Sequence, residues 1–277
     1  MNRSSAPVPG SSPLDETWLQ QECLERGLPW QIRVADEIPS TSDALRAYAL
    51  DGGSHGQVLF AESQTAGRGR RENRWVAPRG LDLMFSLLLR PAEPMVLWPR
   101  LTTLAALAIC RAVETELPLQ PQIKWPNDVY LDGKKVSGLL AEAVNTPSGI
   151  AMVLGIGLNV NSRDFPGELA TTATSLSQAL PGTVLVRELD RQAIALSLLT
   201  ELEAQFQRLA HGFTEVISDV RERSWLLQKQ IRATVDGVEI YGRALDLSPE
   251  GHLILALADG THRTLASADS VRQVVSA

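Results

Sequence analysis

The chain has 277 residues, of which 44% are hydrophobic, and its formal net charge at pH 7 is -6. These values are typical of a globular protein with one large domain, or with one large and one small domain. The negative charge argues against a general nucleic-acid-binding protein, because such proteins usually carry a strongly basic face.

The N-terminal segment and the cysteines bear on where the protein resides. Residues 1–15 begin with a run rich in serine and proline and lack the apolar core of a signal peptide, so we expect a disordered leader. The longest apolar run, residues 149–160, is shorter than the roughly 20 residues that span a bilayer. Cys23 and Cys110 fit neither a disulfide framework nor a Cys-x-x-Cys metal or redox site. We therefore predict a cytoplasmic protein that does not bind membranes.

The first part of the chain alternates predicted helices and strands. Apolar residues recur at helical spacing after Pro99, a residue type that favours the start of a helix. Glycine or proline marks the ends of most predicted elements. The predicted elements are, in order, a helix at 16–27, a strand at 30–39, a helix at 40–53 with Ser40 or Ser42 as N-cap, strands at 57–63 and 81–91, and a helix at 101–117.

The second part begins with a predicted hairpin. Residues 122–131 and 134–144 look like two strands joined by Asp132-Gly133, a strong signal for a two-residue turn. The elements predicted after this hairpin are a buried strand at 149–161 and helices at 188–209 and 214–227.

From residue 228 the chain changes to short strand-like runs separated by turn signals such as Asp236-Gly237 and Asp259-Gly260. Turns at such regular spacing predict a small β-barrel. The predicted fold class is therefore α/β (α+β), with a mixed-sheet domain at 16–227 and an all-β module at 228–277.

Residues 63–78, SQTAGRGRRENRWVAP, concentrate positive charge in an otherwise acidic chain. We call them the arginine segment. They lack the third glycine of the GxGxxG dinucleotide motif and precede a strand instead of a helix, and the chain has no GxxxxGK[ST] motif. The segment is predicted to be a loop that binds a carboxylate or a phosphate. A solvated basic loop without function is the alternative. Its arginines are Arg68, Arg70, Arg71 and Arg74.

A second cluster of polar residues is KWPNDVYLDGKK, residues 124–135. We expect Pro126 to keep Trp125 extended, so that Lys124 lies near the start of one hairpin strand and Lys135 near the start of its partner, and both ammonium groups converge on one anion. Asn127 has the donor and acceptor groups that a nucleoside needs, and Asp128 offers oxygen to a divalent cation. An ordinary surface hairpin is the alternative. Together with the arginine segment, this cluster is expected to gather up to six cationic side chains with few acidic neighbours, which favours activation of a carboxylate by ATP.

Five segments, in order, match one known family: QTAGRGRRENRW, LMFSLLLRP, KWPNDVYLDGKKVSGLLAEA, GIGLNVN and TATSL. From about Ser40 to the C-terminus the chain closely resembles the biotin protein ligases, also called biotin-[acetyl-CoA-carboxylase] ligases. The resemblance implies a catalytic domain of the biotin/lipoate ligase type followed by an SH3-like β-barrel. It also implies that the protein activates biotin with ATP and Mg²⁺ as biotinyl-5'-AMP and transfers biotin to a lysine of a carrier protein.

The resemblance assigns roles to individual residues. The residues it places at biotin are Ser40, Thr41, Ser42, Gln64, Arg68, Gly69, Arg70, Lys135 and Gly138. The residues it places around the adenylate are Arg70, Trp75, Lys124, Asn127 and Asn159. Lys135, which we expect to bridge the biotin carboxylate and the α-phosphate, and Arg70 are the expected catalytic residues. Asp128 is the candidate Mg²⁺ ligand.

The implied macromolecular partner is the biotin carboxyl carrier protein of acetyl-CoA carboxylase, and a homodimer is expected by resemblance. Fewer than forty residues precede Ser40, too few for the helix-turn-helix domain of many relatives, so we expect no nucleic-acid binding.

Glu72 and Asn73 replace a second arginine-glycine pair of the family, and we expect weaker closure of the arginine segment over the ligand. The alternatives are a lipoate or related acyl ligase and a non-catalytic biotin-sensing protein.

Overall fold

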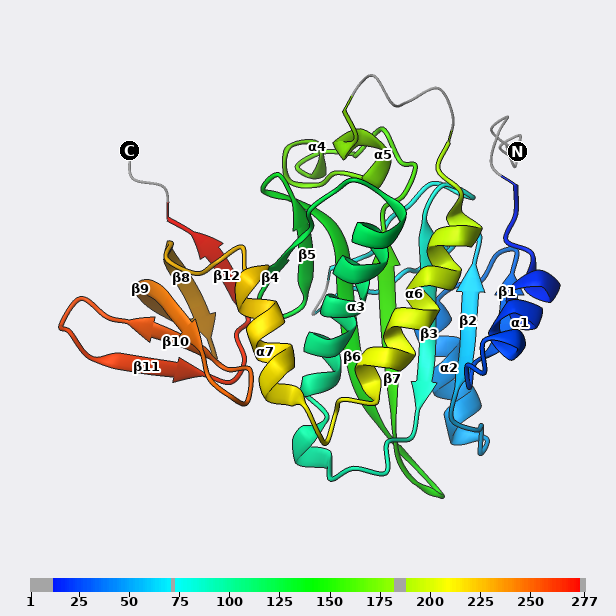
Figure 1. The fold of residues 1–277 in the computed structure, drawn as a ribbon, viewed down its shortest axis with the longest axis horizontal. Helices are drawn as coiled ribbons and strands as arrows, with labels where there is room; N and C mark the ends of the chain where they lie inside the picture. Colours follow the sequence, from blue (N-terminus) through cyan, green and yellow to red (C-terminus); the bar gives the residue numbers. More distant parts are fainter. Residues whose placement is uncertain (1–11, 71–72, 182–187, 275–277) are drawn as a thin grey trace.

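The computed structural model describes residues 12–70, 73–181 and 188–274. Most of the predicted leader, residues 1–11, therefore lies outside the described residues, as do Arg71 and Glu72 of the arginine segment. A large sheet covered by helices forms the body of the molecule, and a smaller C-terminal sheet lies beside it (Figure 1).

Most predicted elements of the first 227 residues are present in the structure. The helices are α1 (Glu16–Glu25), α2 (Thr41–Leu50), the 3-10 helix η1 (Met95–Leu97), α3 (Arg100–Glu116), α4 (Leu169–Thr172), α5 (Leu176–Ala179), α6 (Arg191–Phe206) and α7 (Phe213–Glu222). The strands of the large sheet are β1 (Gln31–Ala35), β2 (Gln57–Ala61), β3 (Leu83–Leu89), β4 (Gln122–Lys124), β5 (Asp128–Leu131), β6 (Lys134–Thr146) and β7 (Gly149–Leu158).

The seven strands of the large sheet are ordered β1-β2-β3-β7-β6-β5-β4. Strands β1 and β2 are parallel, and the other neighbours are antiparallel. The sheet is therefore mixed, which confirms the predicted fold class. Among the described residues, no helix is both long and apolar enough to cross a membrane.

The two faces of the sheet are covered unequally, and this inequality creates the candidate site. One face belongs to the main hydrophobic core, which includes residues of α3 and α6 together with Phe85 of β3 and Leu154 of β7. The other face is covered by α2, whose Leu45 and Ala49 form a small cluster with Val153 of β7. Helix α2 has only 10 residues, so it leaves part of this face uncovered.

The C-terminal module is an antiparallel sheet with the order β11-β10-β9-β8-β12. Asp236 and Gly237 both have positive φ, 49° and 77°, as a tight type I′ hairpin turn requires, so the turn between β8 and β9 is the predicted one. The strands of this module are β8 (Gln230–Val235), β9 (Val238–Leu247), β10 (Leu253–Ala256), β11 (His262–Leu265) and β12 (Ser270–Gln273). The boundary between the two domains stays a prediction.

Two sequence-based element predictions are wrong. Residues 122–131 form two antiparallel strands instead of one, and Lys124 pairs with Asp128 across a reversal that contains a cis Trp125-Pro126 bond. Pro126 has no N–H to continue a strand ladder, and Asn127 instead exchanges hydrogen bonds with Leu139 of β6.

The helix predicted at 214–227 ends at Glu222. Backbone hydrogen bonds join Ile123 of β4 to Arg223 and Trp225, so the chain after α7 continues beside the edge of the large sheet. The predicted leader is also too long, because residues 12–15 contact the folded body: Leu14 N donates to Glu62 at 2.8 Å and Asp15 N to Gln192 at 2.7 Å.

Candidate active site

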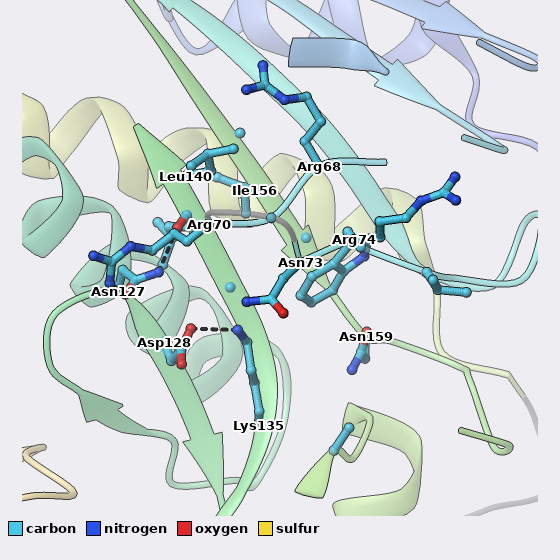
Figure 2. A pocket seen from close by; sticks show the side chains of 18 of the residues that line it. Arg68, Arg70, Asn73, Arg74, Asn127, Asp128, Lys135, Leu140, Ile156 and Asn159 are labelled. Carbon is cyan, nitrogen blue, oxygen red and sulfur yellow. Dashed lines mark hydrogen bonds and ion pairs between the residues drawn. The ribbon is translucent and has the colours of Figure 1, made fainter. Parts of the chain in front are cut away.

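A cavity of about 460 Å³ lies on the face of the large sheet that α2 leaves uncovered. Its walls come from α2, the arginine segment, β3, the reversal between β4 and β5, β6, β7, the segment that contains α4, and β12. Every predicted site residue except Ser40 lines this cavity. Figure 2 labels six of them: Arg68, Arg70, Asn127, Asp128, Lys135 and Asn159. Ser40 is instead the N-cap of α2, where its hydroxyl accepts a hydrogen bond from Asp43 N. The roles of the lining residues remain predictions.

Glycines form the floor of the cavity. On strand β7, Val153 packs under α2, whereas the next two residues on that face are Gly155 and Gly157. Gly138 of β6 is paired with Gly157, so two adjacent strands present backbone without side chains at this point. The missing side chains leave room over the sheet for the ring of Trp75 and the side chain of Lys135.

The ring of Trp75 rests on this glycine floor. A Cβ atom at Gly157 would lie 2.2 Å from the ring, and one at Gly138 would lie 3.1 Å from it. The indole Nε1 is buried and has no hydrogen-bond partner among the described residues. Trp75 therefore brings an aromatic surface and a free donor to the place where the resemblance expects the adenylate.

We expect Gly157→Ala to displace Trp75, because the added methyl overlaps the ring. Loss of an aromatic stacking surface is expected to raise KM for ATP roughly tenfold. Steady-state kinetics of the variant provide the measurement. In a Trp75→Ala background, the same substitution should add little. An additive effect in that background would show that the methyl group acts on something other than Trp75.

Hydroxyl groups line the end of the cavity near α2. Ser86 of β3 lies 2.8 Å from the Thr41 hydroxyl and 2.9 Å from the Ser42 hydroxyl, and all three are buried. Thr41 N also donates to the Gln64 side-chain oxygen at 2.8 Å. These hydroxyl and amide groups are uncharged and offer both donors and acceptors, as a neutral amide-like ligand requires.

Arg68 spans the cavity wall between α2 and β6. Its guanidinium contacts Asp43 at 2.8 Å and Glu142 at 2.7 Å. The expectation of few acidic neighbours is therefore wrong, because helix and strand geometry brings both carboxylates to Arg68 from distant positions in the sequence. We infer that Arg68 holds the wall in place and contributes little free positive charge.

Two lysines lie around Asp128 of β5, Lys135 from β6 and Lys124 from β4. Lys135 Nζ is 2.6 Å from Asp128 Oδ1, and Lys124 Nζ donates to the Tyr130 hydroxyl at 2.8 Å. Burial lowers the pKa of the Lys124 ammonium, and the Asp128 carboxylate opposes this shift. Gly138 leaves room for Lys135, since a Cβ atom there would lie 2.8 Å from its Nζ. This end of the cavity is cationic and suits an anion.

Arg70 links three parts of the chain. It donates to the Asn127 side-chain oxygen and to the Ala268 carbonyl oxygen, each at 2.8 Å. Asn127 lies in the reversal between β4 and β5, and Ala268 lies just before β12 in the C-terminal module. Arg70 therefore holds the arginine segment against both domains beside the cationic end of the cavity.

Asn159 and Asp128 complete the set of predicted residues. Asn159 is buried just after β7, and its side chain donates to Thr174 O at 2.9 Å. In the part of the chain that the structure describes, no three His, Cys, Asp or Glu side chains are grouped as metal ligands. A Mg²⁺ ion that keeps most of its waters and binds substrate phosphates needs only one or two carboxylates, so Asp128 fits such an ion.

Several lining residues of the cavity were not predicted from the sequence, and the most informative of these are Ser86, Gly155, Gly157 and Arg272. Alternation along the strands would have placed the first three on one face, had the strand register been known. Arg272 of β12 lies far from the other residues in the sequence and has no local signal.

Comparison with known proteins identifies the family. Residues 34–161 match the biotin/lipoate A/B protein ligase family, and residues 226–270 match the biotin protein ligase C terminal domain. The bifunctional ligase/repressor BirA of Bacillus spizizenii is 35% identical over 255 residues, which cover 91% of this chain and 75% of that protein. The chain belongs to the biotin protein ligase family.

Two further relatives extend the comparison. The biotin--[acetyl-CoA-carboxylase] ligase of Mycobacterium tuberculosis is 34% identical over 90% of this chain and 92% of its own length. A solved structure of the Aquifex aeolicus biotin protein ligase in complex with biotin and ATP has a TM-score of 0.77 and 27% identity, and covers 88% of this chain and 99% of that one. Relatives and structures thus agree with the family over both domains.

Proposed function

We propose that the chain is an ATP-dependent biotin protein ligase that forms biotinyl-5'-AMP and transfers biotin to a lysine of a carrier protein. The observation that best supports this proposal is the division of one cavity into a hydroxyl-lined end and a cationic end. The complexes of the family with biotin and ATP support this assignment. A lipoate ligase is the alternative, but biotin has a ring urea that needs several hydrogen bonds, and lipoate has no such group.

The proposed binding mode follows from the two ends. Thr41, Ser42, Ser86 and Gln64 would hydrogen-bond the ring urea of biotin near the glycine floor. The valeryl chain would then extend toward Lys135, which would bring the biotin carboxylate to the α-phosphate of ATP. Trp75, Asn127 and Asn159 would surround the adenosine.

In the first step, a carboxylate oxygen of biotin attacks the α-phosphorus of ATP. A new O–P bond forms, the bond to the β-phosphate oxygen breaks, and pyrophosphate leaves. The two reactants are anions and repel each other, so Lys135 and Arg70 are proposed to act by positioning and by neutralising charge. Mg²⁺, held through Asp128, would supply further positive charge to the phosphates.

In the second step, the amine of a carrier lysine attacks the acyl carbon of the adenylate. The amide bond forms, AMP leaves with the electrons of the anhydride bond, and the amine loses a proton. The carrier we propose is the biotin carboxyl carrier protein of acetyl-CoA carboxylase, which the name of the Mycobacterium tuberculosis relative suggests. The homodimer, the cytoplasmic location and the absence of nucleic-acid binding stay predictions.

The function is tested by incubating the protein with biotin, Mg-ATP and a purified biotin carboxyl carrier domain. We expect one biotin per carrier molecule, measured by intact mass, and none on a carrier whose target lysine is replaced by arginine. A protein that consumes ATP with biotin but leaves the carrier unmodified would contradict the transfer step.

The C-terminal module is proposed to contribute Arg272 to the nucleotide. Arg272 lines the cavity, and its charge acts on Lys124. We expect Arg272→Ala to raise KM for ATP about tenfold, the size of one charge-assisted hydrogen bond, with little change in KM for biotin. Arg263→Ala on the exposed strand β11 is the matched control. Equal KM values for ATP in both variants would remove Arg272 from the site.

A further inference from the structure

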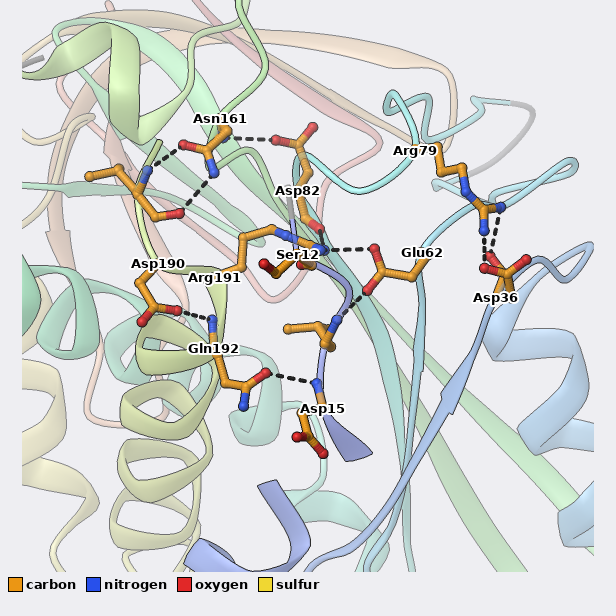
Figure 3. A network of polar contacts seen from close by, with 12 residues as sticks. Ser12, Asp15, Asp36, Glu62, Arg79, Asp82, Asn161, Asp190, Arg191 and Gln192 are labelled. Carbon is orange, nitrogen blue, oxygen red and sulfur yellow. Dashed lines mark hydrogen bonds and ion pairs between the residues drawn. The ribbon is translucent and has the colours of Figure 1, made fainter. Parts of the chain in front are cut away.

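A buried ion pair lies beneath the arginine segment and outside the cavity. Arg191 Nη2 is 2.9 Å from Glu62 Oε2, and the two side chains are only 4% and 5% exposed (Figure 3). Burying two charges costs free energy unless the remaining donors and acceptors are also satisfied. Neighbouring groups satisfy further donors of Arg191 and the second oxygen of Glu62, and they identify the chain segments that the pair joins.

The partners of Arg191 and Glu62 come from three distant parts of the chain. Arg191 also donates to Ser12 O at 2.9 Å and to Asp82 O at 3.2 Å. The second oxygen of Glu62 accepts from Leu14 N at 2.8 Å. One guanidinium thus joins α6 to the N-terminal segment and to two points of the large sheet.

Those two points flank the arginine segment. Glu62 directly follows β2, and Asp82 directly precedes β3. Between them, Gly80 N donates to Glu62 O at 3.0 Å and closes the base of the loop. Residues 63–79, which carry Gln64, Arg68, Arg70 and Trp75, therefore leave the body of the protein between two residues that Arg191 contacts directly.

The same network reaches the segment that follows β7. The Asp82 carboxylate accepts hydrogen bonds from Val160 N at 2.8 Å and from the N–H groups of Asn161 and Ser162 at 3.2 Å. Asn161 exchanges two side-chain hydrogen bonds with the backbone of Leu189, at 2.8 and 2.9 Å, shortly before Arg191. The contacts of Asp82, Asn161, Leu189 and Arg191 therefore form a ring, and this ring holds the residues next to Asn159 in place.

Stability alone is a weak reason for such a pair, because apolar side chains of similar volume often stabilise a protein as well or better. A planar guanidinium can bind several acceptors in fixed directions, which apolar side chains cannot do. We propose that Arg191, paired with Glu62, is a positioning residue that sets the spacing between the two ends of the arginine segment and so retains the adenylate. This inference rests on the proposed ligase function.

The test compares Arg191→Met, Arg191→Lys and Glu62→Gln with wild type. We expect Arg191→Met to raise both KM for biotin and the release rate of biotinyl-5'-AMP about tenfold, with kcat for ATP/pyrophosphate exchange within threefold of wild type. Arg191→Lys and Glu62→Gln should give intermediate release rates, because each keeps part of the network.

Arg111→Met is the control, since it makes the same change at a partly exposed ion pair, with Asp219 at 2.7 Å, that joins α3 to α7. It should lower the melting temperature without changing the release rate. A release rate equal to wild type in folded Arg191→Met and Glu62→Gln would overturn the proposal. So would an equal rise in Arg111→Met, because general destabilisation would then explain the effect.

A second measurement does not depend on activity. Trypsin should cleave after the arginines of the arginine segment at least five times faster in Arg191→Met than in wild type or Arg111→Met. Unchanged cleavage would also overturn the positioning role. If wild-type protein showed no biotin-dependent exchange, the proposed function would fail, whereas the cleavage rates would still decide whether Arg191 positions the segment.

Discussion

Lys135→Ala is expected to lower the rate of adenylate formation by roughly 10³-fold, because positioning and charge neutralisation provide most of the acceleration when two anions react. Lys135 lies over the glycine of β6 with its Nζ 2.6 Å from Asp128, at the cationic end of the cavity. The measurement is single-turnover formation of biotinyl-5'-AMP at saturating biotin and ATP.

Lys134→Ala is the control for this substitution. Lys134 is the preceding residue on β6, is exposed and does not line the cavity. Its variant removes one positive charge from the same strand and should form the adenylate at the wild-type rate. If Lys135→Ala also formed the adenylate within tenfold of wild type, Lys135 would have no part in the chemistry.

Arg70→Gly is expected to release biotinyl-5'-AMP at least ten times faster than wild type. The substitution removes two hydrogen bonds of 2.8 Å, to Asn127 and to Ala268 O, and each charge-assisted bond contributes about 1.5 to 3 kcal/mol. The arginine segment would then no longer be fastened to the C-terminal module beside the ligand. Release is followed by rapid filtration after preformed adenylate is diluted.

Arg74→Gly provides the comparison within the same segment. The Arg74 guanidinium donates to Thr65 O, in the arginine segment itself, so this substitution introduces the same glycine without cutting a link to another domain. We expect a smaller change in release rate than for Arg70→Gly. Equal rates in the two variants would mean that added backbone freedom, and not the lost link, controls release.

The residues that identify the family could be found from the sequence because they lie in five short segments, of which those with GRGR and KWPND are the most specific. The turn at Asp132-Gly133 could also be predicted, since both residues adopt the positive φ that this dipeptide favours, 49° and 77°. The sequence of β7 was equally informative about burial, but it did not say which face its glycines would occupy. That face depends on pairing with β3 and β6, which no local pattern encodes.

The remaining features depend on contacts between distant parts of the chain. The hydrogen bond from Arg70 to Ala268 O joins positions 198 residues apart, and the ion pair between Arg191 and Glu62 joins positions 129 residues apart. Neither Ala268 nor Arg191 belongs to a motif, so neither could be recognised before the fold was known. The reversal at Trp125-Pro126 was missed for a related reason, because its turn is fastened by Asn127 to β6.

In the proposed mechanism, the two ends of the cavity select biotin and activate it with ATP. Biotin-dependent exchange between ATP and labelled pyrophosphate measures this activation, with lipoate and octanoate tested in place of biotin. We expect exchange with biotin and none above background with lipoate or octanoate. Exchange with lipoate but not with biotin would contradict this mechanism and would identify an acyl ligase of different specificity.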